Sequence, residues 1–110
     1  KSNIRPDAAV ELDKIVEVMN EYADMVVELG SHTDCRATVS YNRSLSDRRA
    51  KSSANYIRSR ISKPERIYGK GYGESKLKNR CECEGRRAVP CSEEEHQENR
   101  RTEFVIITMD

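Results

Sequence analysis

The stretch Leu29–Ala50 constrains the fold of this chain more than any other. An apolar run over residues 25–29 stops at Gly30, and a polar loop that carries Asp34 follows it. Arg49 lies 15 residues after Asp34, where the pattern predicts the first turns of a helix. The exit of a strand and the entry of the next helix usually lie on the same rim of an α/β layer, so the sequence predicts that these two charges meet there.

The second half of this stretch predicts a helix over residues 45–61. Ser44 and Asp47 have the spacing of a capping box, with Asp47 in the position usually taken by Glu or Gln. Apolar side chains recur along the helix at the spacing of one buried face: Leu45, Ala50, Ala54, Ile57 and Ile61.

The other elements follow from periodicity and composition. A helix is expected over residues 7–22, because its apolar residues form a stripe at helical spacing: Leu12, Ile15, Val16, Met19 and Tyr22. We expect strands over residues 25–29, 65–68 and 102–108, a turn at the two glycines of Gly71-Tyr72-Gly73, and a short helix capped by Ser92. The unbroken apolar run of residues 102–108 predicts burial on both faces or a central place in the sheet.

The order helix, strand, helix, strand, loop, strand predicts an α+β sandwich in which helices cover one face of a small sheet. At 110 residues the chain is expected to be one domain, residues 1–110. The long polar segment from Gly69 to Glu98 carries three cysteines, so it is expected to be functional or cross-linked.

Asp34 and Arg49 on one rim have two interpretations. The plain one is a surface ion pair worth about 0–1 kcal/mol. The functional one is a clamp for a zwitterion, in which Asp34 accepts from an ammonium and the planar fork of Arg49 binds a carboxylate bidentately. Both residues are expected outside the core, where substitutions change stability by less than about 0.5 kcal/mol.

Several motifs, taken together, carry a resemblance to a known family. These are Ser31-His32-Thr33-Asp34, Asn42, Leu45-Ser46, Arg49-Ala50, the glycines of residues 69–73, and Asn99-Arg100-Arg101. In this order they are similar to the peptidoglycan-binding domain of the OmpA C-terminal family, which includes the peptidoglycan-associated lipoproteins. The resemblance covers nearly the whole chain. Ser31 and Ala37 stand where the family usually has Gly, and the Ala37 change is expected to reshape the lip of the site.

The resemblance implies a mixed β-sheet and a non-catalytic function. The implied ligand is the diaminopimelate of the peptidoglycan stem peptide, and the implied role is to anchor an outer-membrane protein or lipoprotein to the cell wall. Asp34 and Arg49 would hold the ligand, with support from Thr33, Asn42, Leu45 and Arg101. His32 is expected to hydrogen-bond within its own loop. No cofactor and no metal are implied.

The resemblance also implies a location and a missing element. The expected location is the periplasm, with attachment to the outer membrane through a separate upstream part. The family has a further strand before the first helix, and we expect most of it upstream of Lys1, in keeping with a chain that opens without an initiator Met.

The cysteines Cys35, Cys81, Cys83 and Cys91 are candidates for disulfides, for a zinc site or for free thiols. Cys81-x-Cys83 is tighter than the usual zinc spacing and too strained for a bridge between its own two members. Cys91 is therefore expected to pair with Cys81 or Cys83, which leaves the other with Cys35.

Composition narrows the remaining classes of function. With 20 basic and 19 acidic residues, one Phe and no Trp, the chain lacks the basic surplus and the stacking platform of a nucleic-acid binder. A Cys35 nucleophile is disfavoured because the adjacent Asp34 raises the pKa of a thiol. The alternatives left open are a protein-interaction module of the cell envelope and a Cys/His metal-binding domain.

Overall fold

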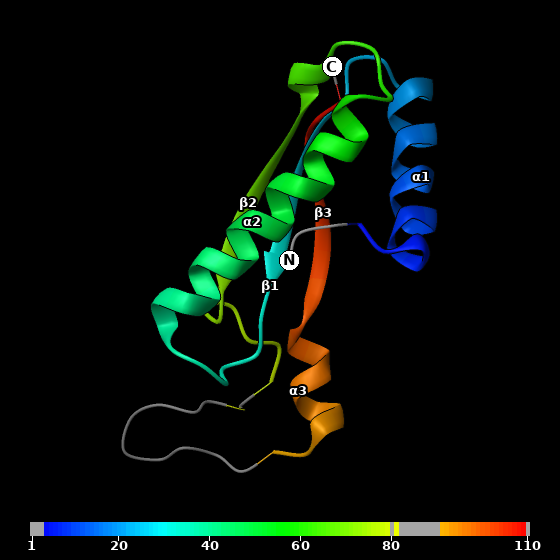
Figure 1. Ribbon diagram of the computed structural model, residues 1–110. Coiled ribbons are helices and arrows are strands. Elements are labelled where there is room, and N and C mark those ends of the chain that lie inside the picture. The colour runs from blue at the N-terminus through cyan, green and yellow to red at the C-terminus, as the bar shows by residue number, and fades with distance from the viewer. Residues whose placement is uncertain (1–3, 80, 82–90, 110) are drawn as a thin grey trace.

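The computed structural model describes residues 4–79, 81 and 91–109. In chain order the elements are α1 (Pro6–Glu21), β1 (Val26–His32), α2 (Val39–Arg58), the short 3₁₀ helix η1 (Pro64–Arg66), β2 (Ile67–Gly73), α3 (Glu93–Asn99) and β3 (Arg101–Thr108). Figure 1 shows α2 lying along the sheet with α1 beside it, and α3 beyond the end of β3. The predicted α+β sandwich on a small mixed sheet is confirmed.

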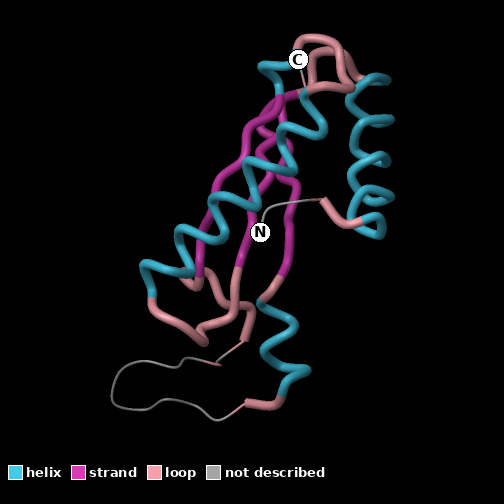
Figure 2. The backbone as a smooth tube through the Cα atoms, in the orientation of Figure 1, coloured by secondary structure: helices cyan, strands magenta, loops and turns pink. Residues whose placement is uncertain are grey.

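The sheet has the strand order β2-β1-β3, so β1 is central. β1 runs parallel to β2 and antiparallel to β3, and Leu29 lies between Gly69 on one side and Phe104 on the other. Figure 2 shows the three strands side by side behind α2. β1 ends at His32, and at the same rim of the sheet β2 ends and β3 begins. The loops that follow β1 and β2 and the segment that precedes β3 therefore lie at one end of the sheet.

The core lies between the sheet and the two long helices. α1 buries Leu12 and Met19 from its predicted stripe, with Ile15 and Val16 packed against the same cluster. The prediction that Tyr22 belongs to the buried stripe is wrong, because α1 ends at Glu21 and Tyr22 is about half exposed. The remaining core residues come mainly from β1 and α2: Met25, Val27, Leu29, Ala50, Ala54, Ile57, Ile61 and Ile67.

α2 begins six residues before its predicted start. Its N-cap is Thr38, whose hydroxyl accepts from the Tyr41 N–H at 3.1 Å. The capping box expected at Ser44 and Asp47 is therefore wrong: Ser44 lies inside the helix and accepts from Arg48. Asp47 instead accepts from the N–H of Gly71 on β2, at 3.3 Å. Thr38 and Ser44 are both residues that can cap a helix, and the sequence pattern alone did not show which of the two does so.

β2 includes the glycines of residues 69–73, so the turn predicted at Gly71-Tyr72-Gly73 is wrong. A Cβ added to Gly69 would lie 2.4 Å from the Ala50 carbonyl oxygen, and one added to Gly71 would lie 2.1 Å from the Asp47 nitrogen. Any side chain at these two positions would thus overlap the α2 backbone. The glycines let α2 pack directly on the strand, which fixes the height of α2 above the sheet rim.

β3 is confirmed as a strand, but its predicted burial on both faces is wrong. It is an edge strand, and the side chains of Val105, Ile106 and Ile107 are 48%, 54% and 51% exposed. An apolar run indicates a strand, but the neighbours that cover it are set by topology. The expected strand upstream of Lys1 lies outside the described residues.

α3 has the predicted cap. The Ser92 hydroxyl accepts from the Glu95 N–H at 3.2 Å, and the Glu95 carboxylate accepts from the Ser92 N–H at 2.9 Å. A disulfide joins Cys81 to Cys91 across 10 residues, just before this helix. That bridge confirms one of the two pairings expected for Cys91.

Cys35 is also disulfide-bonded. Cys83, the cysteine that this pairing leaves for Cys35, lies outside the described residues. The sulfurs of Cys81 and Cys91 lie near Glu95, but disulfide sulfurs are not the thiolate ligands that a zinc site requires.

Candidate functional site

The loop after β1 is fixed by hydrogen bonds on several sides. The Thr33 N–H donates to the Gly73 carbonyl at 2.9 Å, and the Thr33 hydroxyl donates to the Asp34 carbonyl at 2.8 Å. The Asn42 side chain donates to the same Asp34 carbonyl at 3.2 Å and to Glu74 at 2.9 Å. Thr33 and Asn42 thus support Asp34 through its backbone, which leaves the Asp34 carboxylate free to face other groups.

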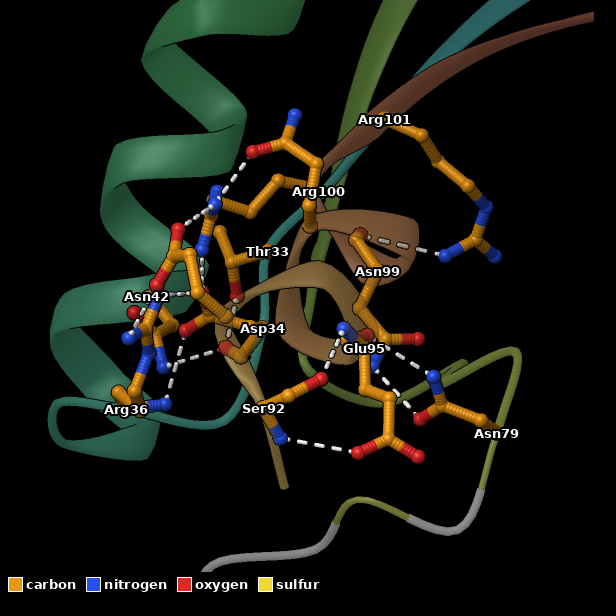
Figure 3. A network of polar contacts seen from close by, with 12 residues as sticks. Thr33, Asp34, Arg36, Asn42, Asn79, Ser92, Glu95, Asn99, Arg100 and Arg101 are labelled. Carbon is orange, nitrogen blue, oxygen red and sulfur yellow. Dashed lines mark hydrogen bonds and ion pairs between the residues drawn. The ribbon is translucent and has the colours of Figure 1, made fainter.

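The Asp34 carboxylate is buried, with 8% of its side chain exposed, and carries two cationic partners. Arg36 donates to Oδ1 from its backbone N–H and to Oδ2 from its guanidinium, both at 2.9 Å. Arg100 donates to Oδ2 from Nη1, and Figure 3 shows its side chain reaching Asp34 from the end of α3. Burial alone would raise the pKa of Asp34, but the donors Arg36 and Arg100 lower that pKa to about 2.

Glu93 completes a ring of alternating charge around Asp34. It accepts from Arg36 at 2.9 Å and from Arg100 Nη2 at 2.5 Å. Arg100 Nη2 also donates to Gln97. The hydrogen bonds from Arg100 and then Arg36 lower the pKa of the Glu93 carboxylate. The network joins the β1 exit loop to the first and last turns of α3.

Asp34 and Arg49 line one pocket of about 420 Å³. Arg49 lies in the middle of α2 and not in its first turns as predicted, because the helix begins at Val39. The residues that line the pocket come from the β1 exit loop, from α2 between its first turn and its middle, and from the end of α3: Thr33, Asp34, Arg36, Tyr41, Asn42, Leu45, Arg49 and Arg100. Arg49 is exposed, and within the described residues its guanidinium makes no hydrogen bond or ion pair. The two charges therefore share a pocket without being paired to each other there.

A second, larger cavity adjoins this pocket. It has a volume of about 630 Å³ and shares Arg49 and Arg100 with the first. Arg101 lines only the larger cavity, where it donates to Glu103 at 2.7 Å and to the Lys76 carbonyl at 2.8 Å. The guanidinium at Asp34 therefore comes from Arg100, and Arg101 holds the loop that follows β2.

The structure thus brings five of the six predicted residues to one pocket: Thr33, Asp34, Asn42, Leu45 and Arg49. Sequence reasoning missed Arg36, Tyr41 and Arg100 as lining residues. Arg36 lies two residues after Asp34, which is the spacing of a local turn, and this signal was available. Arg100 is the C-cap of α3 and Arg101 is the first residue of β3, so the choice between the two depended on where α3 ends.

His32 and Asp34 differ from their sequence-based expectations. The His32 ring stacks on Tyr72 at 5.0 Å between centroids, and its Nε2 lies 3.5 Å from Glu103 on β3. The predicted hydrogen bond within its own loop is wrong, because the buried Nδ1 has no partner in the part of the chain that is described. Asp34 is likewise buried rather than outside the core, so its removal is expected to affect stability.

The lip of the pocket carries one strained residue. Ala37 has a φ of 122°, in the region that favours glycine. At this position the OmpA C-terminal family, which the motifs of the chain resemble, often has Gly. Ala37 thus adopts a backbone conformation that costs a non-glycine residue energy, directly after the turn that Arg36 closes with two bonds to Asp34.

Comparisons with known proteins define the class of this fold and site. The chain belongs to the OmpA family, whose model matches residues 1–89. It is 32% identical over 109 residues to the photosystem I P700 chlorophyll a apoprotein A2 of Gloeobacter violaceus, covering 98% of this chain and 12% of that protein. It is 33% identical over 76 residues to outer membrane porin F of Pseudomonas fluorescens, covering 69% of this chain and 23% of that protein. The chain therefore spans less than a quarter of either relative.

Solved structures show the same fold. The peptidoglycan-associated lipoprotein of Burkholderia pseudomallei superimposes with a TM-score of 0.76 at 17% identity, covering 96% of this chain and 82% of that one. The cell wall anchor of the type VI secretion system of Pseudomonas aeruginosa gives a TM-score of 0.73 at 23% identity, covering 94% and 68%. In the described part of this chain, every helix is too short or too polar to cross a lipid bilayer.

Proposed function

We propose that this domain is a non-catalytic module that binds peptidoglycan through the diaminopimelate of the stem peptide. The observation that carries the proposal is the shared pocket of Asp34 and Arg49, with an anion at one side and, at the other, a guanidinium that no described residue pairs with. Membership of the OmpA family supports it. The names of two proteins with this fold, a peptidoglycan-associated lipoprotein and a cell wall anchor, point the same way.

The chemistry of the ligand matches the two ends of the pocket. The side-chain end of diaminopimelate carries an ammonium and a carboxylate on one carbon. Asp34, held ionised by its low pKa, accepts hydrogen bonds from the ammonium. Arg49 binds the carboxylate bidentately, which the point charge of a lysine cannot do. The adjoining cavity gives the rest of the peptide a path past Arg49.

The wider role follows from the family. We propose that the domain comprises residues 1–110 and anchors an outer-membrane protein or lipoprotein to the cell wall. It would act in the periplasm and meet the membrane only through a separate part of the protein. Porin F, whose name places it in the outer membrane, supports that location.

Arg49→Gln tests the proposal without disturbing the fold, because Arg49 is exposed and makes no bond within the described residues. We expect the variant to lose binding in a pull-down with purified sacculi while its melting temperature stays within about 2 °C of the parent, as for most surface changes. Arg48→Gln is the matched control: it removes a neighbouring exposed arginine of α2 that does not line the pocket. Equal sacculus binding by both variants would contradict the proposal.

Ligand selectivity gives a second test. A stem peptide with lysine in place of diaminopimelate keeps the ammonium but lacks the side-chain carboxylate. Arg49 would then lose its anion, at a cost of about 1–3 kcal/mol, or roughly a 5- to 150-fold loss of affinity. Calorimetry on two peptides that differ only in this residue measures the difference. Equal affinities would show that Arg49 does not select the ligand.

A further inference from the structure

Both guanidinium groups at Asp34, those of Arg36 and Arg100, donate to the same oxygen, Oδ2, while Oδ1 accepts the Arg36 backbone N–H. An ammonium that approaches Oδ2 therefore meets an occupied acceptor. Of the two arginines, Arg36 belongs to the same turn as Asp34 and holds it with its backbone as well as its side chain. Arg100 comes from 66 residues away and contacts Asp34 through Nη1 alone. Arg36 is therefore part of the loop that carries Asp34, whereas Arg100 reaches Asp34 from the end of α3.

Arg100 also has somewhere else to bind. Its Nη2 donates to Glu93 at 2.5 Å and to Gln97, and both acceptors lie on the exposed surface of α3. Its side chain is 27% exposed and lines both cavities. Arg100 can thus leave Asp34 while its charge stays paired with Glu93. Asp34 would keep Arg36 and the ligand's ammonium, so the charge balance of the pocket is unchanged.

We propose that Arg100 is a specificity-determining residue whose guanidinium occupies, on Asp34 Oδ2, the position that the ligand's ammonium takes. This inference rests on the proposed function. Binding is then an exchange of one cation for another on the same oxygen. The bond that the ammonium gains replaces a charge-assisted bond that Arg100 loses, so an ammonium by itself gains little. Only a ligand whose carboxylate also reaches the unpaired Arg49 has a net advantage.

Because of this exchange, a ligand that offers only an ammonium binds weakly, since it must first displace Arg100 from Asp34. A lysine side chain would have to displace Arg100 with no second anchor, whereas diaminopimelate displaces it and binds Arg49 as well. Specificity here comes from an internal competitor as well as from attraction. Glu93 sets the strength of the competitor, because it holds Arg100 after Arg100 leaves Asp34.

Arg100→Gln tests this in the 110-residue chain by calorimetry, with two stem peptides that differ only in diaminopimelate or lysine. We expect the diaminopimelate peptide to bind at least as tightly as to the parent, and the lysine peptide to bind about 10-fold more tightly. The ratio of the two affinities should therefore shrink. If Arg100→Gln loses diaminopimelate binding, or leaves both affinities unchanged, the inference is overturned.

Glu93→Gln separates an exchange from a purely structural role. It leaves Arg100 on Asp34 but replaces the carboxylate to which Arg100 retreats with a neutral amide, so we expect diaminopimelate to bind several-fold more weakly. If the network only held the pocket in shape, both variants would weaken binding together. Opposite directions support the exchange, and a shared loss of binding overturns it even if Arg100→Gln also lowers the melting temperature.

The same measurements distinguish failure of the inference from failure of the proposed function. If the parent binds the diaminopimelate peptide and Arg49→Gln does not, the clamp stands, and the behaviour of Arg100→Gln decides the exchange by itself. If the parent binds neither peptide, or Arg49→Gln binds like the parent, the proposed function and the exchange fail together. Arg48→Gln again controls for the loss of one positive charge.

Discussion

The two strands that flank β1 are held in place by different means. On one side, β2 lies directly against the α2 backbone because Gly69 and Gly71 have no side chains. On the other side, β3 is an edge strand with about half of each side chain from Val105 to Ile107 exposed. The connection that leads to β3 depends on the Cys81–Cys91 bridge and on polar bonds.

The difference shows how the site combines rigidity with an adjustable part. Arg49 comes from the closely packed side, on α2, so its position is set by backbone contacts. Arg100 and Glu93 come from the polar side, where ion pairs and a short helix set their positions. Asp34 lies on the loop between the two and contacts both. We expect substitutions where α2 packs on β2 to have the largest effects on stability, and substitutions on the exposed strand β3 to have the smallest.

The largest effect is expected from Gly71→Ala. The new Cβ would lie 2.1 Å from the Asp47 nitrogen, so α2 must move away from β2. Overpacking against a backbone cannot be relieved by a rotamer change, and we expect a loss of at least about 3 kcal/mol in the free energy of unfolding. Urea denaturation monitored by circular dichroism measures it.

Gly30→Ala is the matched control on β1. Its Cβ would lie 3.1 Å from the ring edge of Tyr72 and 3.5 Å from His32 Nε2, and these are side-chain atoms that can shift by a few tenths of an ångström without moving a backbone. We expect a loss of about 1 kcal/mol or less. If Gly71→Ala is as mild as Gly30→Ala, the close packing of α2 on β2 is not what fixes this side of the molecule.

The next effect concerns the disulfide on the polar side. Replacing both Cys81 and Cys91 by Ala opens a loop of 10 residues and is expected to cost about 2.5 kcal/mol on the chain-entropy model. The double variant is preferable to a reducing agent, because Cys35 is also disulfide-bonded. Its urea midpoint should fall below that of the parent. A loss below about 1 kcal/mol would show that the polar bonds of Asn79 and Asn99 suffice to order this side.

Acid should weaken the contact between the two sides. The pKa of Asp34 is lowered from its ordinary 3.8 to about 2 in the fold, so its stabilising contribution is present above about pH 4 and is lost as the pH falls toward 2. The shift corresponds to about 2 kcal/mol at neutral pH. We expect Asp34→Asn to be less stable than the parent at pH 6, and the gap to narrow by pH 2.5. A constant gap in urea midpoints across this range would contradict the assignment.

The smallest effect is expected at the exposed edge. Val105→Thr keeps a β-branched side chain at a position that is 48% exposed, so stability should change by less than about 0.5 kcal/mol. An exposed apolar edge strand favours self-association, so the variant should remain monomeric to higher concentration. Sedimentation measures this. A large loss of stability would show that β3 is buried in solution, unlike the edge strand described here.

Local sequence determined most of the elements. The apolar stripe of α1 and the Ser92–Glu95 capping box are decided by neighbours within one or two turns, so their patterns were sufficient. The site could be predicted in part for a similar reason. Asp34 lies in the loop directly after β1 and Arg49 lies in the next helix, and short connections leave few ways to arrange them. The motif resemblance supplied the ligand, which spacing alone did not.

Only the tertiary structure decided which side chains meet across long separations. Whether residues 69–73 turn or extend depends on α2, whose backbone lies against Gly69 and Gly71 and leaves no room for a side chain at these two positions. Arg66 is a charged residue, yet it is buried and donates to the carbonyls of Met19 and Met25, which are more than 40 residues away in the sequence. Arg100 reaches Asp34 because α3 ends one residue before it. The physical reason is the same in each case: the energy of a strand or a charge depends on what covers it, and the covering groups come from segments that local patterns do not connect.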